Sequence, residues 1–230
     1  MPPSKVPVAA MVLHCSSVLA ANLPREANSG LVVGCGTGDE VVHLRRALQS
    51  RQVFGVDVGT RFSNLARAER CILIADAVNL PFRRESFNFA AAFHSLEHVG
   101  DVRQALAEIA RILQPGGWFY VGVPNRTRLL GYLGSFDATL WQKIAWNLTD
   151  WRARLRGKFY NEAGAHAGFD REELTNLLEE RFAEVRMLTE EFLRFKYAKR
   201  VPAPVLNLLL SPSLINYSAP AHYALCRKAR

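Results

Sequence analysis

A glycine-rich turn, Gly34-Cys35-Gly36-Thr37-Gly38, directly follows a short apolar run and directly precedes a helical pattern. Glycine suits such a turn because the chain reverses sharply and a ligand can approach the backbone without meeting a Cβ atom. The helix behind the turn begins with free N–H groups. These residue types predict a ligand-binding loop between a strand and a helix.

Two carboxylates follow at the ends of later apolar runs. Asp57 comes 19 residues after Gly38, and Asp76 ends the next run. The carboxyl ends of parallel strands meet at one edge of a sheet, where α/β domains bind ligands. Asp57 can accept hydrogen bonds from both hydroxyls of a ribose, and Asp76 can accept one from an adenine amino group. Loop and acids together predict a nucleoside site, which a lone glycine loop does not.

The spacing of the loop discriminates between nucleoside cofactors. A dinucleotide fold needs the pattern G-x-G-x-x-G, which brings a pyrophosphate to a bare helix N-terminus. Here the pattern is G-x-G-x-G, and Asp39 and Glu40 follow it. These carboxylates repel a phosphate but not an amino or sulfonium cation. The loop therefore favours S-adenosylmethionine over NAD.

The elements that position these residues alternate between strand and helix from about 30 to 125, which predicts βαβ units and a parallel sheet. Strands are expected at 31–33, 53–57, 71–75, 87–93 and 118–123, with helices at 39–49, 61–69 and 102–113. The helix at 102–113 has one apolar face, with Asp101 and Gln104 at its start. Pro115-Gly116-Gly117 is expected to end it.

The alternation breaks from 125 to about 165, where Trp141, Trp146 and Trp151 stand among Arg and Lys residues. This stretch is interpreted as a mainly helical insertion over the ligand-binding edge, because it follows the fifth strand. We expect it to form the pocket for a second substrate. Its tryptophans either line that pocket or belong to the core.

The C-terminal part completes the domain. A helix is expected at 170–182, where Asp170 and Glu173 would form a capping box. Strands are expected at 185–188 and 222–226. Lys199-Arg200 precede the apolar run Val205-Leu206-Asn207-Leu208-Leu209-Leu210, which suits either a membrane surface or an arm packed on the domain.

Composition bounds the class of protein. The 230 residues fit one domain, 1–230, with a cofactor-binding core at 28–125, a helical cap at 126–168 and a C-terminal part at 169–230. The formal net charge of +8 suits either an Arg-rich solvated surface or an anionic partner. An RNA-binding protein is one alternative, although no RNA-binding module is appended.

Four dispersed cysteines form no CxxC pair, which argues against a metal or disulfide framework and fits a reducing, cytoplasmic location. No apolar stretch reaches the roughly 20 residues of a membrane span. Residues 5–14 faintly resemble a signal peptide, but His14 interrupts the run and a leading helix packed on the domain is preferred. We expect a cytoplasmic protein that can also lie peripherally on a membrane.

Residues 28 to 125 resemble the class I methyltransferases, specifically the group similar to the ubiquinone-biosynthesis and type 11 enzymes. The matching motifs are Val32-Val33-Gly34-Cys35-Gly36-Thr37-Gly38, Gly55-Val56-Asp57, Asp76-Ala77 with Leu80-Pro81-Phe82, Ser95-Leu96-Glu97-His98-Val99 and Arg111-Ile112-Leu113-Gln114-Pro115-Gly116-Gly117. The resemblance implies a doubly wound, Rossmann-like α/β fold with a seven-stranded, mostly parallel sheet whose last strand is antiparallel.

The resemblance also implies roles for individual residues and S-adenosylmethionine as cofactor. The glycine loop would contact the methionine end of the cofactor. Asp57, with Val58 beside it, would hold the ribose, and Asp76 and Ala77 would bind the adenine. His94 and Ser95 would line the cofactor near the transferred methyl group, and a small-molecule or lipid-like acceptor would receive it.

Departures from the family pattern keep an alternative open. The acid that usually stands two positions before the first glycine is Val32 here, and the usual Phe-Asp pair is Phe87-Asn88. A non-catalytic methyltransferase-like partner subunit therefore stays among the alternatives, and so does an RNA-directed methyltransferase.

A catalytic base is needed only if the acceptor must lose a proton during transfer. His98 is the first candidate, with local capping or packing as its alternative role. His166 and Tyr160 are weaker candidates, and Glu97 is interpreted as structural.

Overall fold

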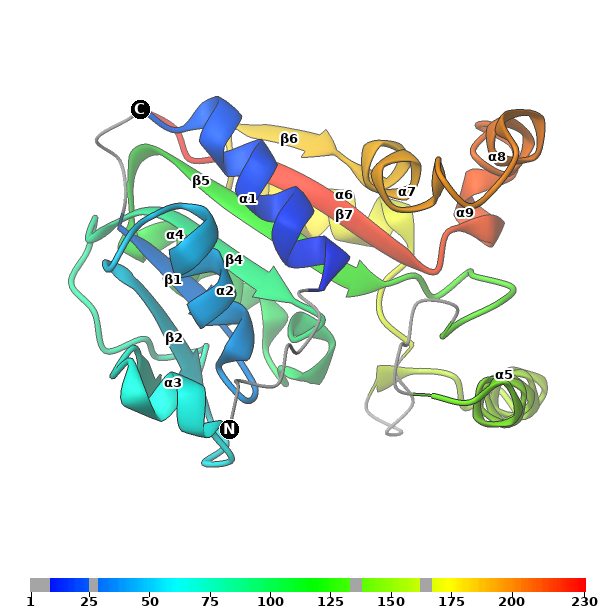
Figure 1. Cartoon of the computed structure of the whole chain (residues 1–230), viewed down its shortest axis with the longest axis horizontal. Coiled ribbons are helices and arrows are strands. Elements are labelled where there is room, and N and C mark those ends of the chain that lie inside the picture. The colour runs from blue at the N-terminus through cyan, green and yellow to red at the C-terminus, as the bar shows by residue number, and fades with distance from the viewer. Residues whose placement is uncertain (1–8, 25–28, 133–137, 162–166) are drawn as a thin grey trace.

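The computed structural model describes residues 9–24, 29–132, 138–161 and 167–230. A seven-stranded sheet runs through the molecule in the order β3-β2-β1-β4-β5-β7-β6 (Figure 1). The strands are β1 (Gly30–Val33), β2 (Val53–Asp57), β3 (Ile72–Ile74), β4 (Phe87–Phe93), β5 (Leu113–Pro124), β6 (Glu184–Met187) and β7 (Ala221–Arg227). The first five are parallel, and β7 is antiparallel to both neighbours. The expected α/β fold with an antiparallel last strand is confirmed.

Alternate residues of the central strands enter two cores, one on each face of the sheet. Val32 and Phe89 point into the first core, whereas Leu31, Val33 and Ala90 point into the second. The first is covered by α1 (Ala10–Asn22), α2 (Asp39–Ala47), α3 (Asn64–Ala68) and α7 (Thr189–Tyr197), and the second by α4 (Val102–Ile112) and α6 (Arg171–Glu179). Burial on both faces explains why these strands are continuous apolar runs.

The leading helix α1 packs on the domain, as the sequence predicts. Val12, Cys15 and Leu19 are fully buried against the sheet. His14, which interrupts the apolar run, is buried too, and its Nδ1 lies 3.0 Å from the hydroxyl oxygen of Tyr120. Figure 1 shows α1 crossing the face of the sheet over β4 and β5.

The join between α4 and β5 differs from the expectation. The Asp101 carboxylate accepts a hydrogen bond from the Gln104 N–H at 2.9 Å, as predicted for the cap. However, the helix ends at Ile112, and β5 begins at once with Leu113 instead of at 118. The register of β5 shifts between Leu113 and Trp118, so the Pro-Gly-Gly sequence forms an irregularity inside the strand. A proline disfavours helical backbone at the residue before it, so Pro115 opposes continuation of the helix through Gln114. Pairing with β4 then makes this segment part of the strand.

Asn88, where the family pattern has an acid, secures this irregularity. Its amide nitrogen donates to the side-chain oxygen of Gln114 at 2.7 Å. Its amide oxygen accepts hydrogen bonds from the backbone N–H and the hydroxyl of Ser29, just before β1. Asn88 therefore has a structural role here, since it donates to Gln114 through its amide nitrogen and accepts from Ser29 through its amide oxygen.

The predicted capping box of α6 is only half formed. The Asp170 carboxylate accepts a hydrogen bond from the Glu173 N–H at 2.8 Å. The Glu173 carboxylate turns away and pairs with Nη1 of Arg126 at 2.9 Å. An ion pair to the segment after β5 thus replaces the expected bond back to the cap.

Two helical segments, here called the two excursions, leave the sheet, one after β5 and one after β6. The first contains α5 (Leu140–Leu155), which stands apart from the domain body in Figure 1. The second contains α7, α8 (Ala203–Leu209) and α9 (Ile215–Ser218). A short helical turn, η1 (Leu96–His98), follows β4. None of the helices in the described ranges has both the length and the apolar content to span a bilayer.

Candidate active site

The glycine loop between β1 and α2 is shaped by two close contacts and one open position. Gly34, Gly36 and Gly38 have φ values of +69°, +53° and +83°, in the region that favours glycine. A Cβ on Gly34 would lie 2.2 Å from Cβ of Ser95, and one on Gly38 would lie 2.7 Å from Cβ of Ala66. A Cβ on Gly36 would meet nothing within 4 Å. Gly36 therefore presents bare backbone to open space, as a cradle for a ligand requires.

Asp57, at the end of β2, is held beside this loop. Its Oδ2 accepts a hydrogen bond from the Gly36 N–H at 2.8 Å, and its Oδ1 accepts one from the Gly59 N–H at 2.7 Å. An ionised carboxylate has about four acceptor positions, so two remain for the hydroxyls of a ribose. Val58, which is 69% exposed, offers an apolar side chain next to it.

Asp76 lies at the same edge, one strand further out. The pairing of Asp57 with Ile74 brings the ends of β2 and β3 together, and Asp76 follows two residues later. Its exposed carboxylate accepts one hydrogen bond from the Val78 N–H at 3.1 Å, while Ala77 is buried. The strand is shorter than expected, yet the acid keeps its predicted place at the sheet edge.

The start of α2 is negatively charged. Asp39 accepts hydrogen bonds from the hydroxyls of Thr37 (3.0 Å) and Ser63 (2.5 Å), which tie the loop to the cap of α3. Burial, with the neighbouring Asp39 charge, raises the pKa of Glu40 to about 7. Val32 is fully buried and brings no carboxyl to this loop, whose acids come from α2 and from Asp57 of β2. A bound cation would be stabilised here, and a phosphate would not.

The end of β4 reaches the loop through Ser95 and turns away from it through His94. The Ser95 hydroxyl donates to the backbone carbonyl of Val33 at 2.8 Å. His94 has a φ of +49°, which is uncommon for a non-glycine residue, and its N–H donates to the carbonyl of Gly122 at 2.8 Å. Its ring meets Tyr223 edge-on at 6.3 Å. These bonds fix His94 between the glycine loop and a neighbouring cavity.

That cavity has a volume of about 450 Å³ and lies at the ends of β5 and β7, between the start of α1 and α7. Its lining is mostly apolar, with two cationic side chains among the aromatic ones. The residues that matter below are Met11, His94, Arg128, Phe192, Lys196 and Tyr223. We call it the acceptor cavity. Three of its walls come from segments more than 60 residues away from the glycine loop in sequence.

Glu97 lies between two histidines at the wall of the acceptor cavity. Its Oε1 is 3.9 Å from Nδ1 of His94 and 4.0 Å from Nε2 of His98. The carboxyl is buried, and burial raises the pKa of Glu97 to about 7, against the lowering effect of the Arg128 charge. Its Oε2 has no hydrogen-bond partner among the residues that the structure describes. Such a carboxyl can hold or share a proton near neutral pH.

His98 borders two cavities. It lines the acceptor cavity and also a more polar cavity of about 590 Å³, which Arg126, Asn161 and Glu173 help to line. Its side chain is 54% exposed. The structure therefore places His98 at the boundary between the two cavities. The sequence was interpreted as giving Glu97 a structural role. The signal for a different role was its spacing, three residues after His94 and directly before His98.

The inserted segment lines the acceptor cavity, but not with its tryptophans. Arg128 and Tyr132 are its described contributions. Trp141 is 78% exposed and lies in neither the core nor the described cavities, while Trp146 packs on Tyr132 at 5.2 Å. The prediction that the tryptophans line the pocket or belong to the core is wrong. The side of α5 that contacts the domain is the one that carries Asp150, which binds Arg128 at 2.9 Å.

The remaining candidates do not join the site. Tyr160 is exposed and lines neither the acceptor cavity nor its polar neighbour. His166 lies outside the described residues. The cysteines, Cys35 included, are free and buried, and burial raises the pKa of the Cys35 thiol to about 12. No three His, Cys, Asp or Glu side chains in the described ranges come together as a metal site would need.

Comparison with known proteins agrees with this architecture. Residues 31–121, which run from β1 into β5, match the family model of a methyltransferase domain. These residues carry a methyltransferase domain of the class I, S-adenosylmethionine-dependent kind. The seven-stranded sheet and the glycine loop that the resemblance implies are both present.

Curated relatives match different shares of the chain. An O-methyltransferase of Penicillium expansum is 36% identical over 102 residues, which are 40% of this chain and 37% of that protein. A demethylmenaquinone methyltransferase of Oceanobacillus iheyensis is 25% identical over 169 residues, 64% of this chain and 71% of that protein. The chain spans 34% to 42% of the length of four of the curated relatives it matches.

Solved structures share the fold over nearly the whole chain. A methyltransferase of Thermotoga maritima superposes with a TM-score of 0.54 at 22% identity, covering 94% of this chain and 89% of that one. The shared fold thus extends beyond the family-model segment, to the helices and strands that follow β5.

Proposed function

We propose that the chain transfers a methyl group from S-adenosylmethionine to a small-molecule or lipid-like acceptor bound in the acceptor cavity. The observation that carries this proposal is the position of His94-Ser95. Ser95 fills the space beside Gly34, and His94 lines the acceptor cavity. Cofactor loop and cavity therefore meet across two adjacent residues. When bound, the cofactor supplies a methyl group on a cationic sulfur, open to in-line displacement.

The chain's own part in such a reaction is to bind, to orient and to exclude water. Asp57 and the Gly36 backbone would hold the nucleoside, with Val58 against the flat base and Asp76 at its amino group. The carboxylates of Asp39 and Glu40 give the loop a negative potential that suits the cofactor's positive charge.

The acceptor cavity favours a molecule with an apolar body and an acidic or anionic group. Met11, Phe192 and Tyr223 provide the apolar walls, and Arg128 and Lys196 the positive charge. Burial lowers the pKa of Lys196, and the nearby charges of Arg200 and Lys143 lower it further. An acidic hydroxyl of the acceptor would relieve this repulsion and would itself be easier to ionise.

If the acceptor loses a proton on transfer, His98 is the group we assign to receive it. Glu97 is the positioning residue, because its buried carboxyl lies within 4.0 Å of the ring. A proton held on His98 would be stabilised by the Glu97 carboxylate. Methylation of an already ionised acceptor would need neither residue.

Calorimetry with S-adenosylhomocysteine tests the proposal directly. We expect the wild-type chain to bind it, and the double variant Asp57→Lys/Asp76→Lys to lose at least about tenfold in affinity. Glu179→Lys, an exposed charge reversal on α6, is the matched control and should bind as the wild type does. Transfer of a labelled methyl group to a panel of hydroxylated apolar acceptors would follow. Absence of any affinity in the wild type, or equal affinity in the double variant, would overturn it.

A further inference from the structure

Helix α5 carries a continuous apolar stripe on its outer side. Five residues recur at i, i+4, i+8, i+11 and i+15, which places them on one helical face. Their exposed fractions are 71% for Leu140, 41% for Ile144, 53% for Leu148, 41% for Trp151 and 85% for Leu155, and Trp141 beside them is 78% exposed. A surface helix of a globular domain normally buries such a stripe, so this one lacks its expected cover.

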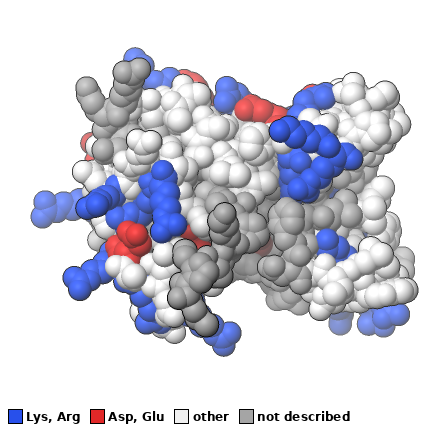
Figure 2. Space-filling view, viewed as in Figure 1, with Lys and Arg blue, Asp and Glu red and all other residues white. Residues whose placement is uncertain are grey.

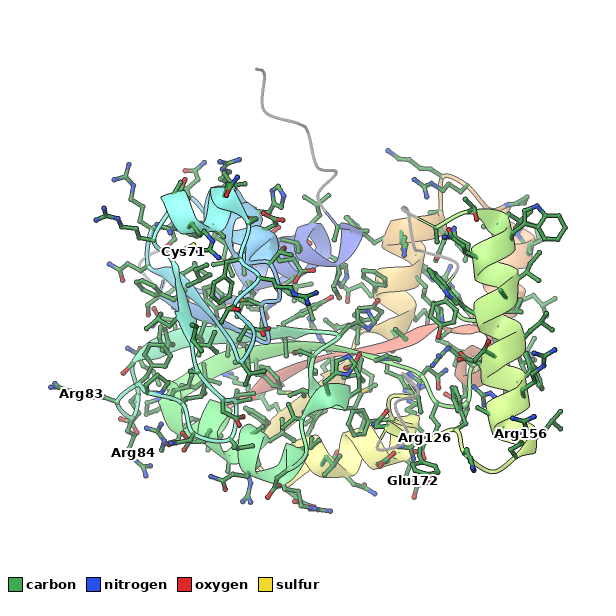
Figure 3. The ribbon with its side chains drawn as sticks, turned by 90° about the horizontal axis from the view of Figure 1, so that it is seen from below. Cys71, Arg83, Arg84, Arg126, Arg156 and Glu172 are labelled. Atoms are coloured by element: carbon green, nitrogen blue, oxygen red, sulfur yellow. The ribbon has the colours of Figure 1, made fainter. Side chains whose placement is uncertain are left out.

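The helix is held to the domain by its polar side. Asp150 binds Arg128 at 2.9 Å, and the Asn147 side chain exchanges hydrogen bonds with the backbone of Gly131. Seen from below in Figure 3, α5 lies along one end of the molecule, with Arg156 beside its last turn. This arrangement fixes the apolar stripe facing outwards.

A second exposed apolar group lies at the same end of the molecule. Val205, Leu208 and Leu209 of α8 are 48%, 61% and 40% exposed, while Leu206 is buried and anchors the helix. Figure 1 shows α5 and α8 at one end of the chain's long axis, both seen along their helix axes. The backbone N–H of Leu129, in the segment leading to α5, donates to the carbonyl of Tyr217 in α9 at 2.8 Å and links the two excursions.

Positively charged side chains outnumber acids around these helices. Residues 138–161 contain five Lys and Arg and one acid, Asp150, which is already paired with Arg128. Residues 189–220, which hold α7 to α9, contain four Lys and Arg and two acids, of which Glu190 pairs with Arg194 at 2.9 Å. Figure 2 shows Lys and Arg side chains gathered over α7, next to α8. Exposed Arg152 and Arg156 flank the stripe itself.

We propose that the exposed faces of α5 and α8, here called the lipid face, dock on an anionic membrane surface. An amphipathic helix with Trp and Leu on one side and Lys and Arg at its flanks lies in the interface of a bilayer, where the apolar side chains enter the acyl boundary. The Lys and Arg side chains meet acidic headgroups, and each cation near the surface strengthens the binding about fivefold. The docking needs neither cofactor nor acceptor and is independent of the proposed reaction.

Two other occupants fit the same observations less well. Nucleic acid would match the positive charge, but bases stack on aromatic rings and make little use of exposed Leu140, Leu148 and Leu155. A second copy of the chain would cover the stripe, but it would bring Arg152 and Arg156 of both copies together without acids to pair them.

Vesicle flotation tests the lipid face. The probes are vesicles of phosphatidylcholine with about 30% phosphatidylglycerol, and vesicles of phosphatidylcholine alone. We expect the full chain to float with the anionic vesicles at low salt, to bind the neutral ones at least about fivefold more weakly, and to show a blue shift of its tryptophan emission on binding. Leu148→Glu/Leu155→Glu should weaken the binding by about tenfold or more.

The control variant adds the same two charges elsewhere on α5. Gln142→Glu/Thr149→Glu places them on exposed positions away from the stripe, and Glu keeps the cap that Gln142 forms with Thr139. It should lose clearly less binding than the stripe variant. Circular dichroism and S-adenosylhomocysteine binding check that both variants fold.

Three results would overturn the inference: no binding of the wild type to anionic vesicles, equal losses in the two variants, or a stable dimer in light scattering that only the stripe variant dissolves. Polynucleotide binding that exceeds vesicle binding and is lost with the stripe would assign the surface to nucleic acid instead. Cofactor affinity is measured separately, so failure here leaves the proposed transfer reaction intact.

Discussion

The carboxylate of Glu97 lies 3.9 Å from Nδ1 of His94, out of solvent at the wall of the acceptor cavity. Burial raises the pKa of Glu97 to about 7, so between pH 4.5 and 7 the folded chain holds a proton that the unfolded chain releases. The free energy of unfolding should therefore fall as the pH rises through this window. Glu97→Gln should remove this slope and stabilise the fold by about 1–3 kcal/mol at pH 8, measured by urea unfolding.

The same variant separates stability from function. If Glu97 positions His98, transfer to an acceptor that must lose a proton should fall by about 10²-fold, while cofactor affinity stays unchanged. Glu97→Asp should restore part of the activity, because it keeps the charge. A Gln variant that is both less stable at pH 8 and fully active would contradict the account of this carboxyl.

Two glycines of the loop should respond differently to the same substitution. Gly34→Ala brings a Cβ within 2.2 Å of Ser95 and should destabilise the fold by several kcal/mol. Gly36→Ala meets no atom within 4 Å, so it should cost only about 1 kcal/mol for its left-handed backbone. Its larger effect should be on cofactor affinity. Thermal unfolding and calorimetry measure the two effects, and equal losses of stability would count against this division.

A substitution of Lys196 should weaken the binding of the acceptor and leave the binding of the cofactor nearly unchanged. Lys196→Met keeps the length of the side chain but removes a charge from the cavity wall, so we expect the KM for an acidic acceptor to rise about tenfold with little change in cofactor affinity. Lys199→Met removes an exposed charge three residues later and serves as the control. Steady-state kinetics with the acceptor varied decides it, and identical behaviour of the two variants would remove Lys196 from the cavity's chemistry.

His222 should make the fold sensitive to acid. It is buried on β7, its ring nitrogens have no hydrogen-bond partner in the described part of the chain, and burial lowers its pKa to about 4. Between pH 6.5 and 4 the unfolded chain binds the extra proton, so stability should be lost as the pH falls through this range. His222→Leu should be more stable than the wild type at pH 5 by about 1–3 kcal/mol in urea unfolding. A less stable variant would show that the ring has a partner after all.

The cofactor half of the molecule could be predicted because its signals are local. The strands at 53–57 and 87–93 have the predicted bounds, since an apolar run ended by turn residues defines a strand buried on both faces. Asp57 and Asp76 lie at one edge because parallel strands bring their carboxyl ends together. The strand β3 is shorter than predicted, since it lies at the edge of the sheet and pairs on one side only.

The acceptor half could not be predicted in the same way. Met11, Lys196 and Tyr223 meet around one cavity only through tertiary packing, and no pattern within their own segments indicates it. The sequence predicts a mainly helical insertion where α5 lies, but it does not show whether a neighbouring element covers the apolar face of that helix. The unusual setting of Glu97, whose carboxyl lies out of solvent between the rings of His94 and His98, is visible only in the structure.

Most of the acceptor cavity's lining comes from outside 31–121, the segment that matches the methyltransferase family model. Met11 precedes that segment, and Arg128, Phe192, Lys196 and Tyr223 follow it. Mutations in this flanking sequence can therefore reshape the cavity without changing the glycine loop, Asp57 or Asp76. Homologues with nearly identical glycine loops should consequently diverge in substrate preference according to their first helix and their last hundred residues.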